Sequence, residues 1–352
     1  MRSIPELDAT APSFDISLIF SAAEPVVIRG LVDHWPAITA ARQSNVTLTQ
    51  FLQGFDNGAS MDTLLLANET EGKVGYDDQS LSKYNFERRK YPISAVLHQL
   101  LKPQSANAVR IALQSARLDW CLPKFQDQHR MPGLSHDVIG RIWIGNQAVV
   151  PAHVDHADNL ALVLAGSRTF TLFPPDQVAN LYIGPLQSAP TGAPISLVDV
   201  LKPDFQKFPR YRLAESAAMR ATLHVGDILY LPALWWHHVQ AHDDFNILLN
   251  YWWGGPIGTG SKEPSPYDAL LTALFTFNDM PDVQRERWRT MFDYFVFRQK
   301  ADNFGHIPPE TAAIQRHLST AEQRALLQYL QQKMVDYLGM LPDGKNAEKN
   351  SK

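Results

Sequence analysis

Histidine–aspartate pairs separated by one residue are the first features of this sequence that carry the chemistry of a metal site. Three such pairs occur: His153 with Asp155, His156 with Asp158, and His242 with Asp244. Alternate residues of a β-strand face the same side, so a pair can offer an imidazole and a carboxylate to one space. These are two of the three ligands of a 2-His-1-carboxylate site, which leaves positions on iron open for a co-substrate and O2.

The surrounding sequence distinguishes the three pairs. His153 follows Pro151 and begins a β-rich stretch, which favours the pair with Asp155. The pair His156/Asp158 is shifted by an odd number of residues, so its side chains should face the other way. The pair His242/Asp244 lies in a polar turn and is expected to be solvated.

A third ligand is expected from a second, distant strand. Gly226 and Asp227 form a tight turn before an apolar strand that ends at Pro232, and two tryptophans then precede His237 and His238. Neighbouring residues of a strand face opposite sides, so one histidine can reach the metal while the other packs. Alone, the histidine pair beside two tryptophans is more typical of an aromatic core edge.

Composition limits the kind of metal site. The chain has 352 residues, with 32 basic and 36 acidic side chains, hence a formal net charge of −4. This balance makes a nucleic-acid partner unlikely as the main one. The single cysteine, Cys121, excludes an internal disulfide and a Cys-rich cluster, so nitrogen and oxygen must hold any metal. Without an apolar leader or a run of about 20 apolar residues, a cytoplasmic protein without a membrane span is expected.

Short apolar runs bounded by glycine and proline fill the middle of the chain and predict an antiparallel sandwich or barrel. The predicted strands are 25–28, 141–145, 160–165, 169–173, 221–225, 228–231 and 245–253. Short helices are predicted over 46–56 and 91–102. The basic cluster 86–90 before the second helix is interpreted as a solvated face.

Helical patterns dominate after residue 265. Helices are predicted from Ser265, from Pro281 and from the capping box that begins at Ser319, the last ending at Gly339. Their aromatic and aliphatic stripes indicate either packing on the β core or self-association. The predicted organisation is a catalytic domain over 1–258, a helical segment over 259–342 that serves dimerisation, and a disordered tail over 343–352.

Several segments, in order and spacing, resemble the cupin-like Jumonji-C dioxygenases, in particular the group that contains the asparaginyl hydroxylase of hypoxia-inducible factor and bacterial cupin-like proteins. The matching segments are 24–30, 35–37, 151–155, 166–176, 226–238 and 250–253. The resemblance implies a mainly β fold with helices: a double-stranded β-helix, or jelly-roll cupin barrel, with N-terminal helices and a C-terminal helical segment.

The resemblance also implies roles for individual residues. It makes His153, Asp155 and His237 the Fe(II) ligands, with His237 preferred to His238, and assigns Asn159 and Asn250 to the pocket of metal and co-substrate. Arg168 stands where the hydroxylase has a lysine that binds the distal carboxylate of 2-oxoglutarate. Val150 replaces a threonine of that pocket, and a tyrosine expected near 111–114 has no counterpart.

The implied function is an Fe(II)- and 2-oxoglutarate-dependent oxygenase that hydroxylates a protein or peptide side chain or a small molecule, using O2. A homodimer formed through the C-terminal helices is expected. Two alternatives stay open: a metal-dependent cupin that does not use 2-oxoglutarate, and a non-catalytic, metal-containing binding module.

Overall fold

The structure is a computed structural model, and it separates the chain into two compact units, Met1–Glu263 and Pro264–Lys352. It describes residues 1–77, 81–103, 108–190, 192–255, 264–297, 304–308, 310–311, 313–315 and 318–341. The predicted domain boundary at 258/259 and the predicted tail 343–352 lie outside the described residues. The two units are therefore described separately.

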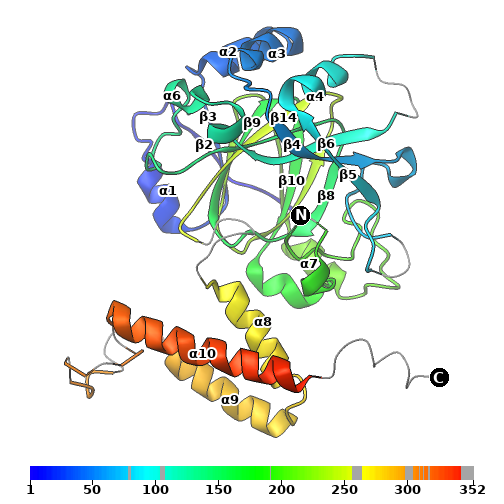
Figure 1. Ribbon diagram of the computed structural model, residues 1–352. Helices are drawn as coiled ribbons and strands as arrows, with labels where there is room; N and C mark the ends of the chain where they lie inside the picture. The colour runs from blue at the N-terminus through cyan, green and yellow to red at the C-terminus, as the bar shows by residue number, and fades with distance from the viewer. Residues whose placement is uncertain are drawn as a thin grey trace. The chain divides into compact units, whose positions relative to one another are not determined.

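Two β-sheets build the first unit and enclose a barrel-like interior (Figure 1). The smaller sheet has the order β1 (Arg2–Ser3), β11 (Met219–Leu223), β10 (Arg168–Phe173), β13 (Trp236–Ala241), β8 (Val149–His153). The larger has the order β2 (Glu6–Asp8), β3 (Val26–Arg29), β12 (Ile228–Leu231), β9 (Asp158–Ala165), β14 (Asn246–Trp253), β7 (Arg141–Gly145), β6 (Arg110–Arg117), β4 (Ser60–Leu66), β5 (Phe86–Pro92). The predicted jelly-roll fold with mainly β structure is confirmed.

Helices cover the outer face of the larger sheet. Figure 1 shows α2, α3, α4 and α6 gathered along one side of the barrel. The α-helices of this unit are α1 (Ile16–Ala22), α2 (Pro36–Gln43), α3 (Asn45–Gln53), α4 (Ile93–Leu100), α5 (Leu118–Cys121), α6 (Phe125–Gln128) and α7 (Tyr211–Ala217). Short 3₁₀ turns lie at η1 (Asn68–Thr70), η2 (Pro175–Asn180) and η3 (Leu186–Ser188).

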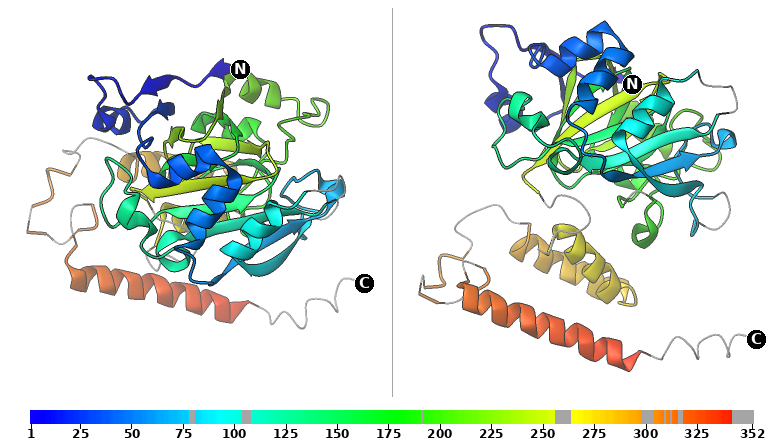
Figure 2. Two further views of the ribbon diagram at one scale, coloured as in Figure 1. Left: turned by 90° about the horizontal axis from the view of Figure 1, so that it is seen from above. Right: turned by 45° about the horizontal axis from the view of Figure 1, so that its top comes forward.

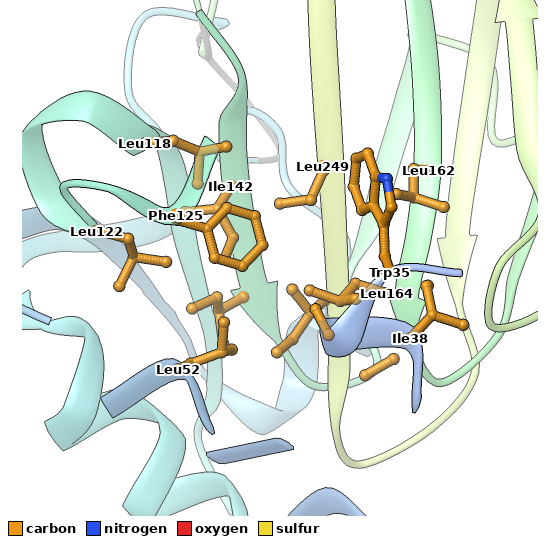
Figure 3. Close-up of a cluster of buried hydrophobic side chains, with 14 of the residues drawn as sticks. Trp35, Ile38, Leu52, Leu118, Leu122, Phe125, Ile142, Leu162, Leu164 and Leu249 are labelled. Carbon is orange, nitrogen blue, oxygen red and sulfur yellow. The ribbon is translucent and has the colours of Figure 1, made fainter. Parts of the chain in front are cut away.

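The largest core lies between these helices and the sheet. Trp35, which precedes α2, packs with Ile38 of α2 and Leu52 of α3 against the larger sheet. The outward-facing side chains of β7, β9 and β14 that they meet include Leu162 and Leu249 (Figure 3). Burying this much apolar surface on one face of the larger sheet stabilises the barrel wall. The other face of the same strands is thereby free to line the interior.

A second apolar cluster fills the interior between the sheets, and strand alternation decides which residues enter it. On β10, Phe170 and Leu172 belong to this cluster, so Arg168 shares their face. On β13, Val239 belongs to it, so His237 faces inward as well. The barrel interior therefore receives both a cation and an imidazole from neighbouring strands.

Most predicted strands are confirmed, with three differences in the outer elements. The segment 86–92, read as a basic cluster followed by a helix, is the edge strand β5, and α4 begins only at Ile93. Its charged side chains are exposed, as predicted, and charges on an edge strand discourage pairing with other chains. Strands β1, β2, β4 and β6 were not predicted from the sequence. Finally, α10 runs to Met340, so Gly339 does not end it.

The second unit consists of α8 (Pro266–Phe277), α9 (Asp282–Phe295) and α10 (Thr320–Met340). Ser265 and Ser319 form capping boxes at the starts of α8 and α10. Figure 2 shows the three helices side by side, and Phe275 contacts Tyr337 while Phe277 contacts Trp288. Within the described residues, no helix has the length and apolar character needed to span a membrane.

Candidate metal centre

The three predicted metal ligands come together at one end of the barrel. His153 ends β8 and is directly opposite His237 of β13, and the two ring centroids are 4.1 Å apart. One possible ligand atom from each of His153, Asp155 and His237 can be chosen so that all lie within 4.8 Å of one another. Two imidazoles and one carboxylate at this spacing match the donor set of a 2-His-1-carboxylate metal site.

Backbone hydrogen bonds orient both imidazole rings. Nδ1 of His153 lies 2.9 Å from the carbonyl oxygen of Pro151, and Nδ1 of His237 lies 3.0 Å from that of Trp235. A carbonyl oxygen only accepts, so each Nδ1 carries the proton and donates it. The Nε2 lone pair of each ring then remains available for a metal.

Burial keeps His237 in its neutral form. Burial itself, and then the neighbouring His153 ring, lower the pKa of His237, while the Asp155 carboxylate opposes this shift. Nε2 of His237 lies 3.7 Å from Oδ2 of Asp155. A neutral imidazole beside a carboxylate is the protonation state that binds a divalent cation, so the residues present fit a metal ion.

His238 is on the opposite face of β13 from His237. It pairs in register with Thr171 of β10, and its Nδ1 is buried without a hydrogen-bond partner. Burial lowers the pKa of His238 to about 4. The position of His238 outside the barrel interior agrees with the preference for His237 as the ligand.

Asp155 reaches the site from a loop, and not from a strand as its spacing from His153 suggested. Strand β8 ends at His153, and Asp155 lies in the connection to β9. Its backbone carbonyl accepts a hydrogen bond of 2.9 Å from Leu234 N–H, and its Oδ2 accepts one of 3.0 Å from Trp252 Nε1–H. These two contacts fix the carboxylate next to the histidines.

Trp252 is therefore expected to support metal binding. Replacing it by phenylalanine keeps an aromatic ring but removes the hydrogen bond to Asp155, and losing such a partner of a metal ligand typically costs about 10- to 100-fold in metal affinity. Mn(II) titration followed by electron paramagnetic resonance measures this loss. The control is Trp253→Phe. Trp253 is the next residue of β14, and it faces the other side of the sheet, where it packs against Phe20 and Tyr230. Equal Mn(II) affinity in both variants would contradict the assigned role.

Arg168 is a buried cation without an anion. Its relative exposure is 9%, and burial lowers its pKa to about 10. Among the described residues, no carboxylate forms an ion pair with its guanidinium, and its Nε has no hydrogen-bond partner. An uncompensated buried charge is costly, so this arrangement indicates a binding site for an anionic ligand.

The strand register relates Arg168 to the candidate metal centre. Leu172 of β10 is opposite His237 of β13. Arg168 lies four residues before Leu172, on the same face of β10. This separation corresponds to about 13 Å along the strand. The long arginine side chain and a short dicarboxylic acid can together span that distance.

Asn159 and Asn250 form a buried polar pair in the same interior. Asn250 Nδ2–H donates a hydrogen bond of 3.0 Å to Asn159 Oδ1. Both lie on the inward-facing sides of β9 and β14. Val150 also faces the interior, opposite Val239, and supplies no hydrogen-bond donor. The roles that the resemblance gave to the two asparagines remain predictions.

The other two histidine–aspartate pairs do not contribute to this centre. Asp158 Oδ1 accepts a hydrogen bond of 2.9 Å from Ala233 N–H, which ties the start of β9 to the turn before β13. His242 and Asp244 are exposed, as predicted, and bond to Thr169 and Gln147. These contacts are structural.

Three inward-facing residues near the site were not singled out from the sequence. Trp143 of β7 has a buried Nε1–H without a partner, Trp252 contacts Asp155, and Arg141 lies over the Trp252 ring. Residues two apart in a strand share a face, so the sequence already placed Trp252 on the side of Asn250 and Trp143 on the side of Arg141. Which side faces the metal ligands became clear only from the pairing of β7 with β14.

Comparison with known protein families gives a match over most of the chain. The model of the cupin-like domain matches residues 12–258. That span includes all three candidate metal ligands and Arg168. It ends close to the point where the structure separates its two compact units.

Several curated proteins are similar to the chain. The HSPB1-associated protein 1 homolog of Danio rerio is 37% identical over 119 residues, covering 32% of this chain and 24% of that protein. The bifunctional peptidase and (3S)-lysyl hydroxylase JMJD7 of Homo sapiens is 26% identical, and the match covers 65% of this chain and 77% of that protein. Lysine-specific demethylase 8 of Xenopus tropicalis is 24% identical, and the match covers 65% of this chain and 48% of that protein. The match thus spans less than half the length of two of these relatives.

Proposed function

Because the chain belongs to the cupin-like Jumonji-C family, we propose that it is an Fe(II)- and 2-oxoglutarate-dependent oxygenase that hydroxylates its substrate. Among its relatives, one is named a lysyl hydroxylase and another a lysine-specific demethylase. These names support an oxygenase that acts on a protein or peptide side chain, with a small molecule as the other substrate class. The narrower resemblance to the asparaginyl hydroxylase remains a prediction.

The observation that carries the proposal is the combination of the His153/Asp155/His237 cluster with the unpaired Arg168 in one barrel. A metal-binding cluster alone fits any metal-dependent cupin. A buried guanidinium and a buried Trp143 N–H, neither with a partner among the described residues, add donors for an anionic oxygen ligand. A dicarboxylate held at one end by a metal and at the other by arginine satisfies both.

In this proposal, His153, Asp155 and His237 hold Fe(II), and Arg168 binds the distal carboxylate of 2-oxoglutarate. Bound together, these groups supply the oxidising chemistry: 2-oxoglutarate, O2 and a substrate C–H group become succinate, CO2 and a C–OH group. The protein orients the histidines through their Nδ1–H bonds and the carboxylate through Trp252. The apolar interior lining, including Val150 and Val239, limits the access of water.

Succinate formation tests the proposed activity. The protein incubated with Fe(II), ascorbate, 2-oxoglutarate and air should convert 2-oxoglutarate to succinate slowly even without substrate, as followed by proton NMR. Omitting Fe(II) or excluding O2 should stop the conversion. Succinate that forms equally without Fe(II) or O2 would contradict the proposal.

The two alternatives predict different ligand behaviour. A cupin that does not use 2-oxoglutarate, or a non-catalytic binding module, would retain metal at His153, Asp155 and His237 and gain nothing from 2-oxoglutarate. Neither alternative gives the buried charge of Arg168 a partner. For this reason the oxygenase is preferred.

We further propose that the C-terminal unit joins two copies of the chain. None of the residues in α8, α9 or α10 is buried, and isolated helices depend on packing of an apolar face for their stability. On α10, Leu327, Leu330, Met334 and Leu338 form an exposed apolar stripe at helical spacing. A second copy of this stripe is a partner of matching chemistry.

Charge placed in the stripe should break such a dimer. Leu330→Asp combined with Met334→Asp is expected to halve the mass measured by light scattering coupled to size-exclusion chromatography, because two carboxylates would be buried at the interface. Ala325→Asp, an exposed change on the opposite face of the same helix, is the control. A wild-type protein of monomer mass would overturn the proposed dimer.

A further inference from the structure

Arg141 is a second cation near the candidate metal centre, and it forms no ion pair within the part of the chain that the structure describes. It lies on β7, opposite Asn250 of β14, on the same strand face as Trp143. Its guanidinium carbon is 5.7 Å from the centre of the Trp252 ring, and Trp252 Nε1 is 3.0 Å from Oδ2 of Asp155. One tryptophan ring therefore separates this guanidinium from the metal-ligand carboxylate.

The hydrogen bonds of Arg141 leave much of its guanidinium unused. Nη1–H donates to Ser115 at 3.1 Å to the carbonyl oxygen and 3.3 Å to Oγ. In the part of the chain that the structure describes, Nε and Nη2 have no hydrogen-bond partner, yet neither is a fully buried atom. Two donors thus remain accessible at a half-buried position.

Neighbouring charges do not neutralise Arg141. The nearest acid that affects it, Asp119, is engaged by Arg117 through two hydrogen bonds of 3.0 and 2.6 Å. Burial, and then the neighbouring Arg117, lower the pKa of Arg141, and only Asp119 opposes this shift. Arg117, Asp119 and Arg141 together carry one net positive charge where the end of β6 meets the start of β7.

Packing on Trp252 alone does not require an arginine. A cation–π contact and hydrogen bonds to Ser115 stabilise the side chain but use only one of its nitrogens. Two free donors in a fixed planar fork match the geometry of a carboxylate. A positive charge at this place disfavours a substrate whose reacting side chain is an ammonium group.

We propose that Arg141 binds a carboxylate of the substrate and thereby selects acidic substrates for the reaction at the metal centre. This inference rests on the proposed oxygenase function, because it assigns the substrate side of the same site. Arg168 would hold the co-substrate inside the barrel, and Arg141 would hold the substrate at its opening. The carboxylate is either that of an Asp or Glu side chain in a peptide or that of a free carboxylic acid.

Binding of matched acidic and neutral probes tests the inference. The protein is first loaded with Mn(II) and 2-oxoglutarate without O2. It is then exposed to two degenerate peptide pools, one with a central Asp and one with a central Asn. In a separate experiment it is exposed to free aspartate or free asparagine. Retained probe is measured by mass spectrometry. Wild-type protein should retain the acidic member of one pair about 10- to 100-fold better, as expected for a charge-assisted hydrogen-bonded pair. The pair that shows the preference identifies the source of the carboxylate.

Variants separate charge recognition from a structural role. Arg141→Met should abolish the acidic preference, whereas Arg141→Lys, which keeps the charge, should restore much of it. Arg110→Met is the matched control. Its Nη1–H also donates to backbone carbonyls, those of Glu71 and Gln147, but Arg110 lies at the end of β6 away from Arg141. The control should keep the wild-type preference.

Two results would overturn the inference: no acidic preference in the wild-type protein, or an unchanged preference in Arg141→Met. Failure of the proposed function has a different signature. In that case 2-oxoglutarate would give no additional thermal stabilisation to the Mn(II)-loaded wild-type protein, whatever the peptide pools show. The melting measurement is therefore made on the same samples.

Discussion

His153→Ala and Asp155→Ala variants are expected to lose Fe(II)-dependent succinate formation by more than about 100-fold, since disturbing only the partners of metal ligands costs 10- to 100-fold in many sites. Each change removes one of the three donor groups whose ligand atoms lie within 4.8 Å of one another. The fold should persist, because His153 lies at the end of β8 and the backbone contact of Asp155 with Leu234 is retained. Succinate production and the melting temperature without metal measure the two effects.

The matched control is the exposed pair that repeats the same motif. His242→Ala and Asp244→Ala remove an imidazole and a carboxylate with the same spacing. Both lie in the exposed connection between β13 and β14, outside the cluster, and bond to Thr169 and Gln147. Both should retain activity close to that of the wild type. Full turnover in Asp155→Ala, or equal losses in Asp155→Ala and Asp244→Ala, would refute the assignment of the ligands.

Arg168→Met is expected to weaken 2-oxoglutarate binding by about 100-fold, because removing one member of a buried, hydrogen-bonded charge pair costs about 2–5 kcal/mol. The same change should not destabilise the protein without ligand. Methionine removes a buried charge that has no partner among the described residues and leaves an apolar side chain next to Phe170. The apparent KM for 2-oxoglutarate and the melting temperature without ligand are measured together.

This opposite behaviour of binding and stability distinguishes a ligand-binding arginine from a structural one. Arg168→Lys should recover part of the affinity, since the charge remains but the planar fork is lost. Arg220→Met, on the exposed side of the neighbouring strand β11, should leave the KM unchanged. A lower melting temperature with normal KM in Arg168→Met would assign the arginine to the fold.

Local patterns were sufficient to predict the elements that form the barrel. The strands over 141–145 and 228–231 coincide with β7 and β12, since apolar, β-branched runs between glycines and prolines have few other stable conformations. The opposite facing of His237 and His238 followed from strand alternation alone. The family resemblance then joined two segments separated by about eighty residues.

Other features depended on contacts between distant segments. The charged strand β5 has no apolar alternation, and it is a strand because it pairs with β4. Asp155 enters the site from a loop that Leu234 and Trp252 hold in place. Gly339 lies in the last turn of α10, one residue before its end at Met340, because a glycine costs a helix only about 1 kcal/mol and does not by itself end it.

The isolation of the two arginines was likewise invisible in the sequence. Arg168 and Arg141 are two of 32 basic residues, and nothing in their sequence neighbours shows that, among the described residues, neither forms an ion pair with a carboxylate. Only the register of β10 with β13, and of β7 with β14, places them at the barrel interior and its opening. Charge balance in three dimensions, which a total of −4 does not reveal, is the basis on which we propose both as ligand-binding residues.

Thermal melting with Mn(II) and 2-oxoglutarate, with O2 excluded, tests the central claim most directly because it requires no knowledge of the substrate. A ligand that binds only the folded protein raises its melting temperature, and the stabilisation grows with the logarithm of the ligand concentration relative to Kd. The account predicts stabilisation by Mn(II), a further rise with 2-oxoglutarate only when Mn(II) is present, and loss of that further rise in Arg168→Met. An unchanged melting temperature with Mn(II) and 2-oxoglutarate together would contradict it.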